Sequence, residues 1–388
     1  MPKKQFLLMT VITAIILICI IGFYFISRSS PDLPTYFSYS ENEKKTLIDS
    51  SSKQEIMIDA LKKWDTIMFN LVKDNKLGDA RASRVYAYLY TAQRDAAFLS
   101  MNIKKRFMGN IDLVSAQTLC LFFENDCADL KAQTVKFTDP YSQALANIVL
   151  VKIQARIKAD EKNIHDYPLL TPAEQHWKGI PPYYGIEVGS WMPWRIDSVN
   201  KFVAPAPPSY NSSEWQHQLQ LTKDALMHIT PEQTKLVVFW AGNPGTVTPP
   251  GLWLIAANNY IFLHKIPMQK VLLVRSILTM SMADAVIAVF NSKYLYQVKR
   301  PFMLDPTILT IMPTPNHPSY PAGHSTISAA AATVLSYYFP DQSRYWLQTA
   351  DEASMGRIWG GIHFTIDAQQ GMILGKKVSE AVIAKEKN

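Results

Sequence analysis

The sequence KYLYQVKRP (Lys293 to Pro301) is followed along the chain by NHPSYPAGHS (Asn316 to Ser325) and GRIWGGIHFTID (Gly356 to Asp367). The charged and imidazole residues of these stretches include three cations and two histidines at regular spacings, which are Lys293, Arg300, Arg357, His324 and His363. Guanidinium forks match the oxygens of a tetrahedral oxyanion, and a lysine adds a point charge. The composition of this segment therefore predicts a site for phosphate or a similar anion.

His324 directly follows Pro321-Ala322-Gly323 and precedes an alanine-rich run from Ser325 to Tyr338. The run predicts a helix, with His324 at its N-terminus, where free backbone N–H groups and the helix dipole favour an anion. Gly323 would then offer its N–H to the anion. One histidine of such a site can attack the central atom while the other protonates the leaving oxygen.

The spacings are K-x6-R-P, P-A-G-H and R-x5-H-x3-D. This pattern resembles the three-part signature of the superfamily that joins type 2 phosphatidic acid phosphatases, bacterial acid phosphatases and vanadium haloperoxidases. The family pattern is K-x6-R-P, P-S-G-H and S-R-x5-H-x3-D, so Ala322 and Gly356 stand where it has serines. Two upstream segments, ARASRVYAYLYTAQRDAAF and TMSMADAVIAVFNSKY, look like leading helices of the haloperoxidase-like branch.

The resemblance implies roles for seven residues. His363 is the nucleophile candidate, oriented by Asp367, which would share its face if one helix carried both residues. His324 is the general acid candidate. The oxyanion would be bound by Lys293, Arg300, Gly323 and Arg357. His317 is expected either to be part of the loop structure or to line the mouth of the site, and Asp284 either braces one of the arginines or is a partly exposed helix residue.

Two enzyme functions fit such a site. The first is an extracytoplasmic phosphatase that hydrolyses phosphate esters through a phosphohistidine, with no cofactor. The alternative is a vanadium-dependent haloperoxidase, in which vanadate is ligated by His363 and activates peroxide to oxidise halide. Ala322 favours the phosphatase, because it removes a hydroxyl that the family offers to the bound oxyanion. No metal-binding motif occurs, since H-E-x-x-H and paired C-x-x-C are absent.

The composition agrees with a globular enzyme of small anionic substrates. The chain has 388 residues, 48% of them hydrophobic, and a net charge of +7. Lys and Arg are spread rather than gathered in a stripe, which argues against nucleic acid as a partner. Helical periodicity dominates, so we expect an all-α bundle of the acid phosphatase/vanadium haloperoxidase type over residues 54–388. We expect helices at 56–72, 80–102, 140–158, 232–240, 252–265 and from 268 to the first motif, with Asp139 and Thr230 as signals for the starts of the third and fourth.

The N-terminal part predicts membrane attachment. Lys3 and Lys4 precede an apolar run from Phe6 to Ile26, long enough to span a bilayer. Residues 1–28 are therefore predicted to be a transmembrane signal anchor, with a cleaved signal peptide as the alternative, and residues 29–53 a polar tether. The catalytic domain would lie outside the cytoplasm, in the periplasm or at the cell surface. There, Cys120 and Cys127 form either a local disulfide or two buried thiols.

One long segment between helices is rich in proline and aromatic residues. It runs from Pro181 to Pro208 and contains Tyr183, Tyr184, Trp191 and Trp194. Long loops of this kind are functional or serve as linkers. We expect either a flap over the mouth of the site or a strap packed across the bundle.

Overall fold

The computed structural model describes residues 32–48, 57–104, 111–134, 139–161, 170 and 173–387. It divides the chain into two compact units, Met1–Pro34 and Thr35–Asn388, and the second unit contains all three motifs. Within the described ranges this unit is helical, with two isolated bridges and no strand ladder. The expected all-α bundle is thereby confirmed, whereas the predicted signal anchor at residues 1–28 lies outside the described residues.

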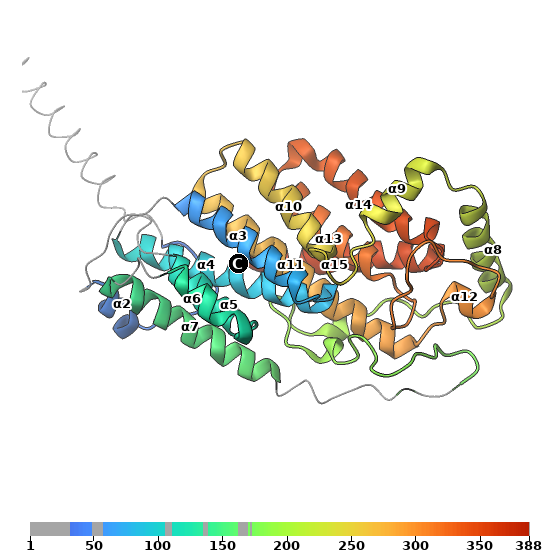
Figure 1. Cartoon of the computed structure of the whole chain (residues 1–388), viewed down its shortest axis with the longest axis horizontal. Helices are drawn as coiled ribbons and strands as arrows, with labels where there is room; N and C mark the ends of the chain where they lie inside the picture. Colours follow the sequence, from blue (N-terminus) through green and yellow to red (C-terminus); the bar gives the residue numbers. More distant parts are fainter. Residues whose placement is uncertain are drawn as a thin grey trace, which may run out of the picture. The chain divides into compact units, whose positions relative to one another are not determined.

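The central element is α11 (Met268–Tyr296), which packs against α4 (Asp79–Lys104), α13 (Gly323–Tyr338) and α15 (Thr365–Lys387) (Figure 1). By length and composition α11 could cross a membrane, and it is the one such helix among the described residues. However, 94% of its most apolar window is buried inside the bundle. It is therefore the core helix of this unit, and its last turn carries Lys293 of the first motif.

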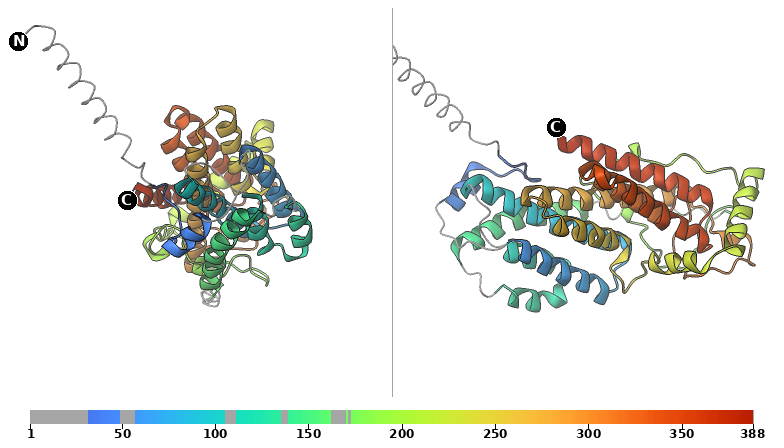
Figure 2. Two further views of the ribbon diagram at one scale, coloured as in Figure 1. Left: turned by 90° about the vertical axis from the view of Figure 1, so that its left-hand side faces the viewer. Right: turned by 90° about the horizontal axis from the view of Figure 1, so that it is seen from above.

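The other helices are arranged around this core, and Figures 1 and 2 show α2 and α8 at opposite ends of the unit. Their bounds are α2 Glu41–Ile48, α3 Met57–Asp74, α5 Ile111–Cys120, α6 Cys127–Ala132, α7 Pro140–Glu161, α8 Ser213–Met227, α9 Pro231–Phe239, α10 Thr248–Leu263, α12 Pro301–Leu304 and α14 Ser343–Trp359, with short 3₁₀ turns at Glu124–Asp126, Val188–Ser190, Val199–Lys201 and Pro340–Gln342.

The predicted helix starts are formed by side-chain caps. Asp139 accepts a hydrogen bond from the backbone N–H of Ser142 at 2.9 Å, at the start of α7. Thr230 and Gln233 form a reciprocal capping box ahead of α9, with Pro231 in the first turn. Each cap satisfies N–H groups that a helix leaves unpaired at its start. The sequence therefore identified these two helices by their boundaries as well as by their periodicity.

The segment from Pro181 to Pro208 is a strap that packs across the bundle. Asp284 of α11 accepts three backbone N–H bonds from it, from Trp194 at 2.6 Å, Arg195 at 2.8 Å and Ile196 at 3.1 Å. Asp284 is therefore a fully buried anchor of the strap, and neither predicted role of this residue is correct. Burial raises the pKa of Asp284 to about 6. The expected flap is also wrong for most of the segment, although Tyr184 does line the pocket beside the motifs.

The polar tether expected over residues 29–53 is partly folded where it is described. Residues 41–48 form α2, and the backbone N–H groups of Tyr36 and Phe37 donate to the carboxylate of Asp95 at 2.6 and 2.8 Å. Asp95 is fully buried, so its two oxygens need these donors. Composition alone did not reveal that this segment is anchored, because Asp95 lies more than 50 residues away along the chain.

Cys120 and Cys127 form a disulfide, which is one of the two states expected for this pair.

Candidate active site

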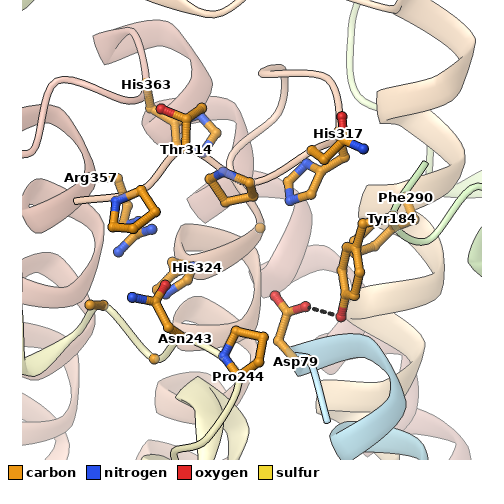
Figure 3. A pocket seen from close by; sticks show the side chains of 17 residues that line it. Asp79, Tyr184, Asn243, Pro244, Phe290, Thr314, His317, His324, Arg357 and His363 are labelled. Atoms are coloured by element: carbon orange, nitrogen blue, oxygen red, sulfur yellow. Dashed lines mark hydrogen bonds between the residues drawn. The ribbon is translucent and has the colours of Figure 1, made fainter. Parts of the chain in front are cut away.

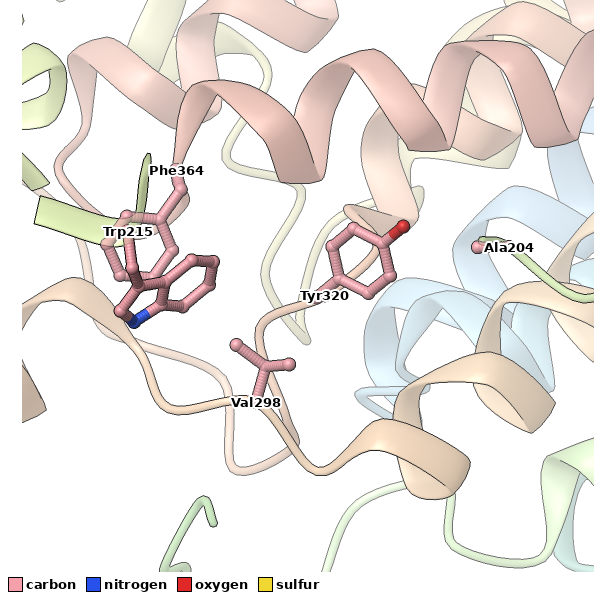
Figure 4. Close-up of a cluster of buried hydrophobic side chains, with 5 residues drawn as sticks. All are labelled: Ala204, Trp215, Val298, Tyr320 and Phe364. Carbon is pink, nitrogen blue, oxygen red and sulfur yellow. The ribbon is translucent and has the colours of Figure 1, made fainter. Parts of the chain in front are cut away.

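An apolar cluster holds the three motifs together. Val298 comes from the first motif, Tyr320 precedes Pro-Ala-Gly-His, and Phe364 follows His363 (Figure 4). Trp215 of α8 packs on Phe364, with ring centroids 4.7 Å apart. Ala204 of the strap completes the cluster. Burial of these side chains fixes three segments, distant in sequence, at one end of α11.

Residues of the second and third motifs line a cavity of about 460 Å³. The second motif contributes Gly323 and His324 to its wall. The third motif contributes Arg357 and His363 (Figure 3). The lining residues are Gly78, Asp79, Tyr184, Ala241, Gly242, Asn243, Pro244, Phe290, Pro313, Thr314, Pro315, Asn316, His317, Gly323, His324, Arg357 and His363. The pocket is thus polar and cationic on the motif side, and its other walls are largely apolar.

His363 is held by Asp367 through one ring nitrogen. Nδ1 of His363 lies 2.9 Å from Oδ2 of Asp367, and the hydroxyl of Ser319 donates to the same oxygen at 2.5 Å. A carboxylate accepts, so Nδ1 carries the hydrogen and Nε2 keeps its lone pair. Ser319 lies within the second motif segment, and sequence analysis assigned it no role. The contact between one ring nitrogen of His363 and Asp367 was predicted correctly, and the nucleophilic role of His363 stays a prediction.

The predicted helical register of this pair is wrong. Helix α14 ends at Trp359, so His363 lies in the turn between two helices and Asp367 in the first turn of α15. The turn requires Gly361, whose φ of +73° is in the left-handed region. The backbone N–H of Phe364 also donates to Oδ2 of Asp367, at 3.1 Å. Asp367 therefore caps α15 and orients the histidine at the same time.

Burial governs the protonation of this pair. It raises the pKa of Asp367 to about 6, against the opposing effect of the Ser319 hydrogen bond and the Lys293 charge. The pKa of His363 falls well below 6.5, first through burial and then through Arg300 and Lys293. His363 is therefore neutral at physiological pH, which is the form that a nucleophile requires.

Arg300 is buried and is shared among protein acceptors. Its NH1 group donates to the carbonyl of Ile362 at 2.8 Å and lies 2.9 Å from Nε2 of His363. Its Nε donates to the carbonyl of His317 at 3.1 Å. Arg300 thereby joins the turn of the third motif to the segment before the second. Burial lowers the pKa of Arg300 to about 10, so it stays charged.

Lys293, like Arg300, is buried and donates to backbone carbonyls of the chain segment before Pro-Ala-Gly-His. Its Nζ donates to the carbonyls of Pro318 and Ser319, at 2.9 and 2.7 Å, and the side chain is fully buried. Burial and the neighbouring Arg300 lower the pKa of Lys293 well below its usual value. Neither Lys293 nor Arg300 lines the cavity itself, so both lie behind its wall and supply charge to it from there.

Arg357 is the cation that lines the cavity. Its NH1 group donates to the carbonyl of Trp240 at 3.2 Å, while its buried Nε has no partner in the described part of the chain. Burial and Arg300 lower its pKa to about 9. Buried donors without acceptors are rare in proteins, and this one belongs to a side chain that lines a pocket predicted to bind an anion. Of the three predicted cations, Arg357 is best placed to bind the anion directly.

His324 sits in the first turn of α13, as predicted, and also lines the cavity. Its Nε2 lies 2.9 Å from the carbonyl of Trp240, so this nitrogen carries a hydrogen. Burial and Arg357 lower the pKa of His324 well below 6.5. A Cβ at Gly323 would meet only Lys293 Cε, at 3.9 Å, so the start of α13 is open where it lines the pocket.

The wall away from the cations contains residues that sequence analysis missed. Asp79 accepts a hydrogen bond from the hydroxyl of Tyr184 at 2.7 Å, and both residues line the cavity (Figure 3). His317 also lines it, which was one of the two placements expected for this residue, and it packs near Tyr184, with ring centroids 5.8 Å apart. Asp79 precedes the helix predicted from residue 80, but nothing in its sequence neighbourhood connects it to motifs 200 residues away.

The two departures from the family pattern lie in different surroundings. Ala322 is fully buried at the N-cap position of α13, and it does not line the cavity. Its place beside a bound anion therefore stays a prediction. Gly356 faces α9, because a Cβ there would lie 3.8 Å from the Cα of Val237. The replacement of the family's serine by Gly356 therefore lies where α14 packs on α9.

Residues 273–383, which contain all three motifs, match the model of the PAP2 superfamily. Undecaprenyl-diphosphatase of Sulfolobus acidocaldarius is 33% identical over 106 residues, which cover 26% of this chain and 50% of that protein. The chain thus spans about half the length of this curated relative. The resemblance to this superfamily, predicted from the three motifs, is confirmed.

Solved structures of vanadium-dependent enzymes share the fold. A bacterial vanadium-dependent iodoperoxidase has a TM-score of 0.74 at 20% identity, covering 86% of this chain and 98% of that one. A holo-type bacterial vanadium-dependent chloroperoxidase has a TM-score of 0.63 at 13% identity, covering 80% and 94%. At these identities the likeness concerns the fold alone.

Proposed function

We propose that this chain, whose residues 273–383 match the PAP2 superfamily, hydrolyses phosphate esters with His363 as nucleophile and His324 as general acid. One observation carries the proposal. His363 lines a cationic pocket, and Asp367 holds it in the tautomer whose Nε2 carries no hydrogen. Attack on phosphorus would replace the hydrogen bond that this nitrogen accepts from NH1 of Arg300. A second histidine lines the same pocket and is available for proton transfer.

The reaction would proceed in two balanced steps. In the first, Nε2 of His363 attacks phosphorus, the bond to the ester oxygen breaks, and His324 gives that oxygen a proton. In the second, water attacks the phosphohistidine, its proton returns to His324, and phosphate leaves. Because Nε2 of His324 is bonded to the carbonyl of Trp240, Nδ1 is the nitrogen that we assign to this transfer. Arg357 would neutralise the charge on the phosphoryl oxygens.

Substrate binding would also favour protonation of His324, which takes up the proton from solvent. In the ligand-free pocket, burial and the charge of Arg357 keep the pKa of His324 low, so its ring is neutral. A phosphate dianion next to both groups offsets the charge of Arg357 and favours the imidazolium. His363 stays neutral more readily, because its Nε2 faces Arg300. The two histidines would thus take opposite roles in one pocket.

Vanadium-dependent haloperoxidase activity is the second candidate, and the same residues fit vanadate. It is also a tetrahedral oxyanion, and the unprotonated Nε2 of His363 is a suitable ligand for it. Arg357, Arg300 and Lys293 would balance its charge. Bound vanadate would supply peroxide activation for halide oxidation. Ala322 lacks the hydroxyl that a permanently bound oxyanion could use, which is why we favour the phosphatase.

The deciding experiment is to assay the purified full-length chain in two ways. One assay measures release of phosphate from phosphate monoesters without vanadate, and the other measures vanadate-dependent oxidation of iodide or bromide by peroxide. We expect hydrolysis that is inhibited by vanadate. Halide oxidation with no ester hydrolysis would reverse the assignment.

We also propose that the catalytic unit acts outside the cytoplasm, anchored by residues 1–28. The basic start and the apolar run from Phe6 to Ile26 support this orientation. The disulfide between Cys120 and Cys127 supports it independently, since disulfides persist in oxidising compartments. A periplasm-active reporter fused after Asn388 should be active, with the chain in the membrane fraction. Cytoplasmic reporter activity would contradict this orientation, and a soluble, shortened chain would mean that the segment is cleaved.

A further inference from the structure

The pocket contains a carboxylate on the wall away from its cations. Asp79 is the first residue of α4, and its Oδ1 accepts bonds from the N–H of Ala80 at 2.8 Å and from the hydroxyl of Tyr184 at 2.7 Å. The Tyr184 hydroxyl in turn accepts from the N–H of Ala80 at 3.0 Å. One oxygen of the carboxylate is therefore fixed by two donors, and the orientation of the side chain is set.

The neighbouring chain is shaped to hold this pair. A Cβ at Gly78 would lie 2.3 Å from the hydroxyl oxygen of Tyr184, so only glycine lets the tyrosine reach Asp79. The ring of Tyr184 packs against Phe290 with centroids 5.8 Å apart. Asp79 and Tyr184 are thus a built feature of the pocket wall, fixed from α4, the strap and α11.

The second oxygen of Asp79 is directed into the cavity (Figure 3). Within the described ranges, no donor is bonded to Oδ2 and no cation lies within 4.0 Å of the carboxylate. A negative charge here opposes binding of an anionic substrate, because its field reaches Lys293 and Arg357. A partly buried charge without a partner is unfavourable, so its natural counterpart is a cation on the ligand.

The pocket therefore has charge of both signs on different walls. Arg357, His324 and His363 lie on one side, Asp79 lies on another, and Phe290 and Pro244 add apolar surface (Figure 3). We propose that the substrates are small zwitterionic phosphate esters, in which the alcohol part carries an ammonium group that Asp79 binds. This inference rests on the proposed phosphatase function and names its substrate class. A cavity of about 460 Å³ suits such a ligand.

The test uses two phosphonates that cannot be hydrolysed. 3-Aminopropylphosphonate and n-butylphosphonate have the same length and differ in a terminal ammonium or methyl group. Calorimetry on the full chain should show that the amino compound binds roughly ten-fold tighter or more, as expected for a charge-assisted hydrogen bond. Equal affinities, or tighter binding of the butyl compound, would overturn the proposal without the need of any variant.

Asp79→Asn then assigns the preference to this residue. Asparagine keeps an oxygen that accepts from Tyr184 and Ala80 but removes the charge, so the preference should disappear. The control is Asp139→Asn, which removes the same charge at the start of α7, away from the pocket lining. It should retain the preference. A folded Asp79→Asn protein that still favours the amino compound as the wild type does would contradict our assignment.

Turnover separates this inference from the phosphatase proposal. With phosphoethanolamine and n-propyl phosphate as substrates, Asp79→Asn should lower kcat/KM for the first about ten-fold and change the second little. Equal losses for both esters would mean that Asp79 acts in the chemical step, which contradicts a role in recognition. If the phosphonate preference is found but neither ester nor any other monoester is hydrolysed, the phosphatase proposal fails and the ammonium site stands.

Discussion

Nδ1 of His363 lies 2.9 Å from Oδ2 of Asp367, although the two residues belong to different elements, a turn and the first turn of α15. The carboxylate holds the turn through the N–H of Phe364 and the imidazole through Nδ1, so the tautomer of His363 depends on the start of α15. The reactive nitrogen of the proposed nucleophile is thereby set by helix capping. This connection makes the pair the most informative place to test the site.

Asp367→Asn should lower kcat roughly 10²- to 10⁴-fold, because an amide can present its NH2 group to Nδ1 and favour the wrong tautomer. Single-turnover kinetics with a phosphate ester would measure the loss. Ser319→Ala is the matched comparison. It removes one donor to the same oxygen and should cost less, since the contact with His363 remains. A larger loss from Ser319→Ala than from Asp367→Asn would argue against the orienting role of Asp367.

His363→Ala should abolish both turnover and any acid-labile phosphoenzyme. His324→Ala should still form phosphoenzyme from esters with good leaving groups, because these need no proton. Rapid acid quench followed by phosphate analysis of the protein distinguishes the two variants. Normal turnover in His363→Ala would remove this residue from the nucleophile role.

The pH dependence of kcat/KM should show an acidic limb near pH 6. Asp367 has a pKa of about 6, above the ordinary value, so its ionised form exists above this pH and is lost as the pH falls through it. The proposed mechanism needs the ionised form, so kcat/KM should fall about ten-fold per unit below pH 6. Asp367→Asn should keep only residual activity without this limb. An unchanged limb in that variant would assign it to the substrate or to another group.

Ala322→Ser tests the departure within the second motif. If the side chain lies beside the anion, the new hydroxyl should tighten vanadate inhibition about ten-fold, equivalent to roughly 1.5 kcal/mol. Inhibition constants of both proteins in one buffer give the answer. Because residue 322 is the N-cap of α13, the hydroxyl could instead cap the helix. Equal constants with a raised Tm would show this and would remove the main support for preferring the phosphatase.

Asp284→Ala should lower the free energy of unfolding by about 3 kcal/mol, since it leaves three backbone N–H groups of the strap without an acceptor. Urea titration measures the change, and limited proteolysis should show faster cleavage between residues 181 and 208. Asp59→Ala on the exposed face of α3 is the control, with an effect within about 0.5 kcal/mol. A strap as resistant in Asp284→Ala as in the wild type would contradict the anchoring role.

The sequence by itself determined the helical class and the starts of α7 and α9, and it predicted which residues form the candidate site. Helical periodicity and helix caps depend only on residues close together in the sequence, so they can be recognised without the structure. The three motifs were recognised by the fixed spacings of their charged residues and histidines. Tertiary structure alone decided that Lys293 and Arg300 lie behind the pocket wall while Arg357 lines it. It also brought Asp79 and Ser319 to the site and made Asp284 the anchor of the strap. These roles depend on contacts between residues far apart in sequence, which packing creates and no local pattern encodes.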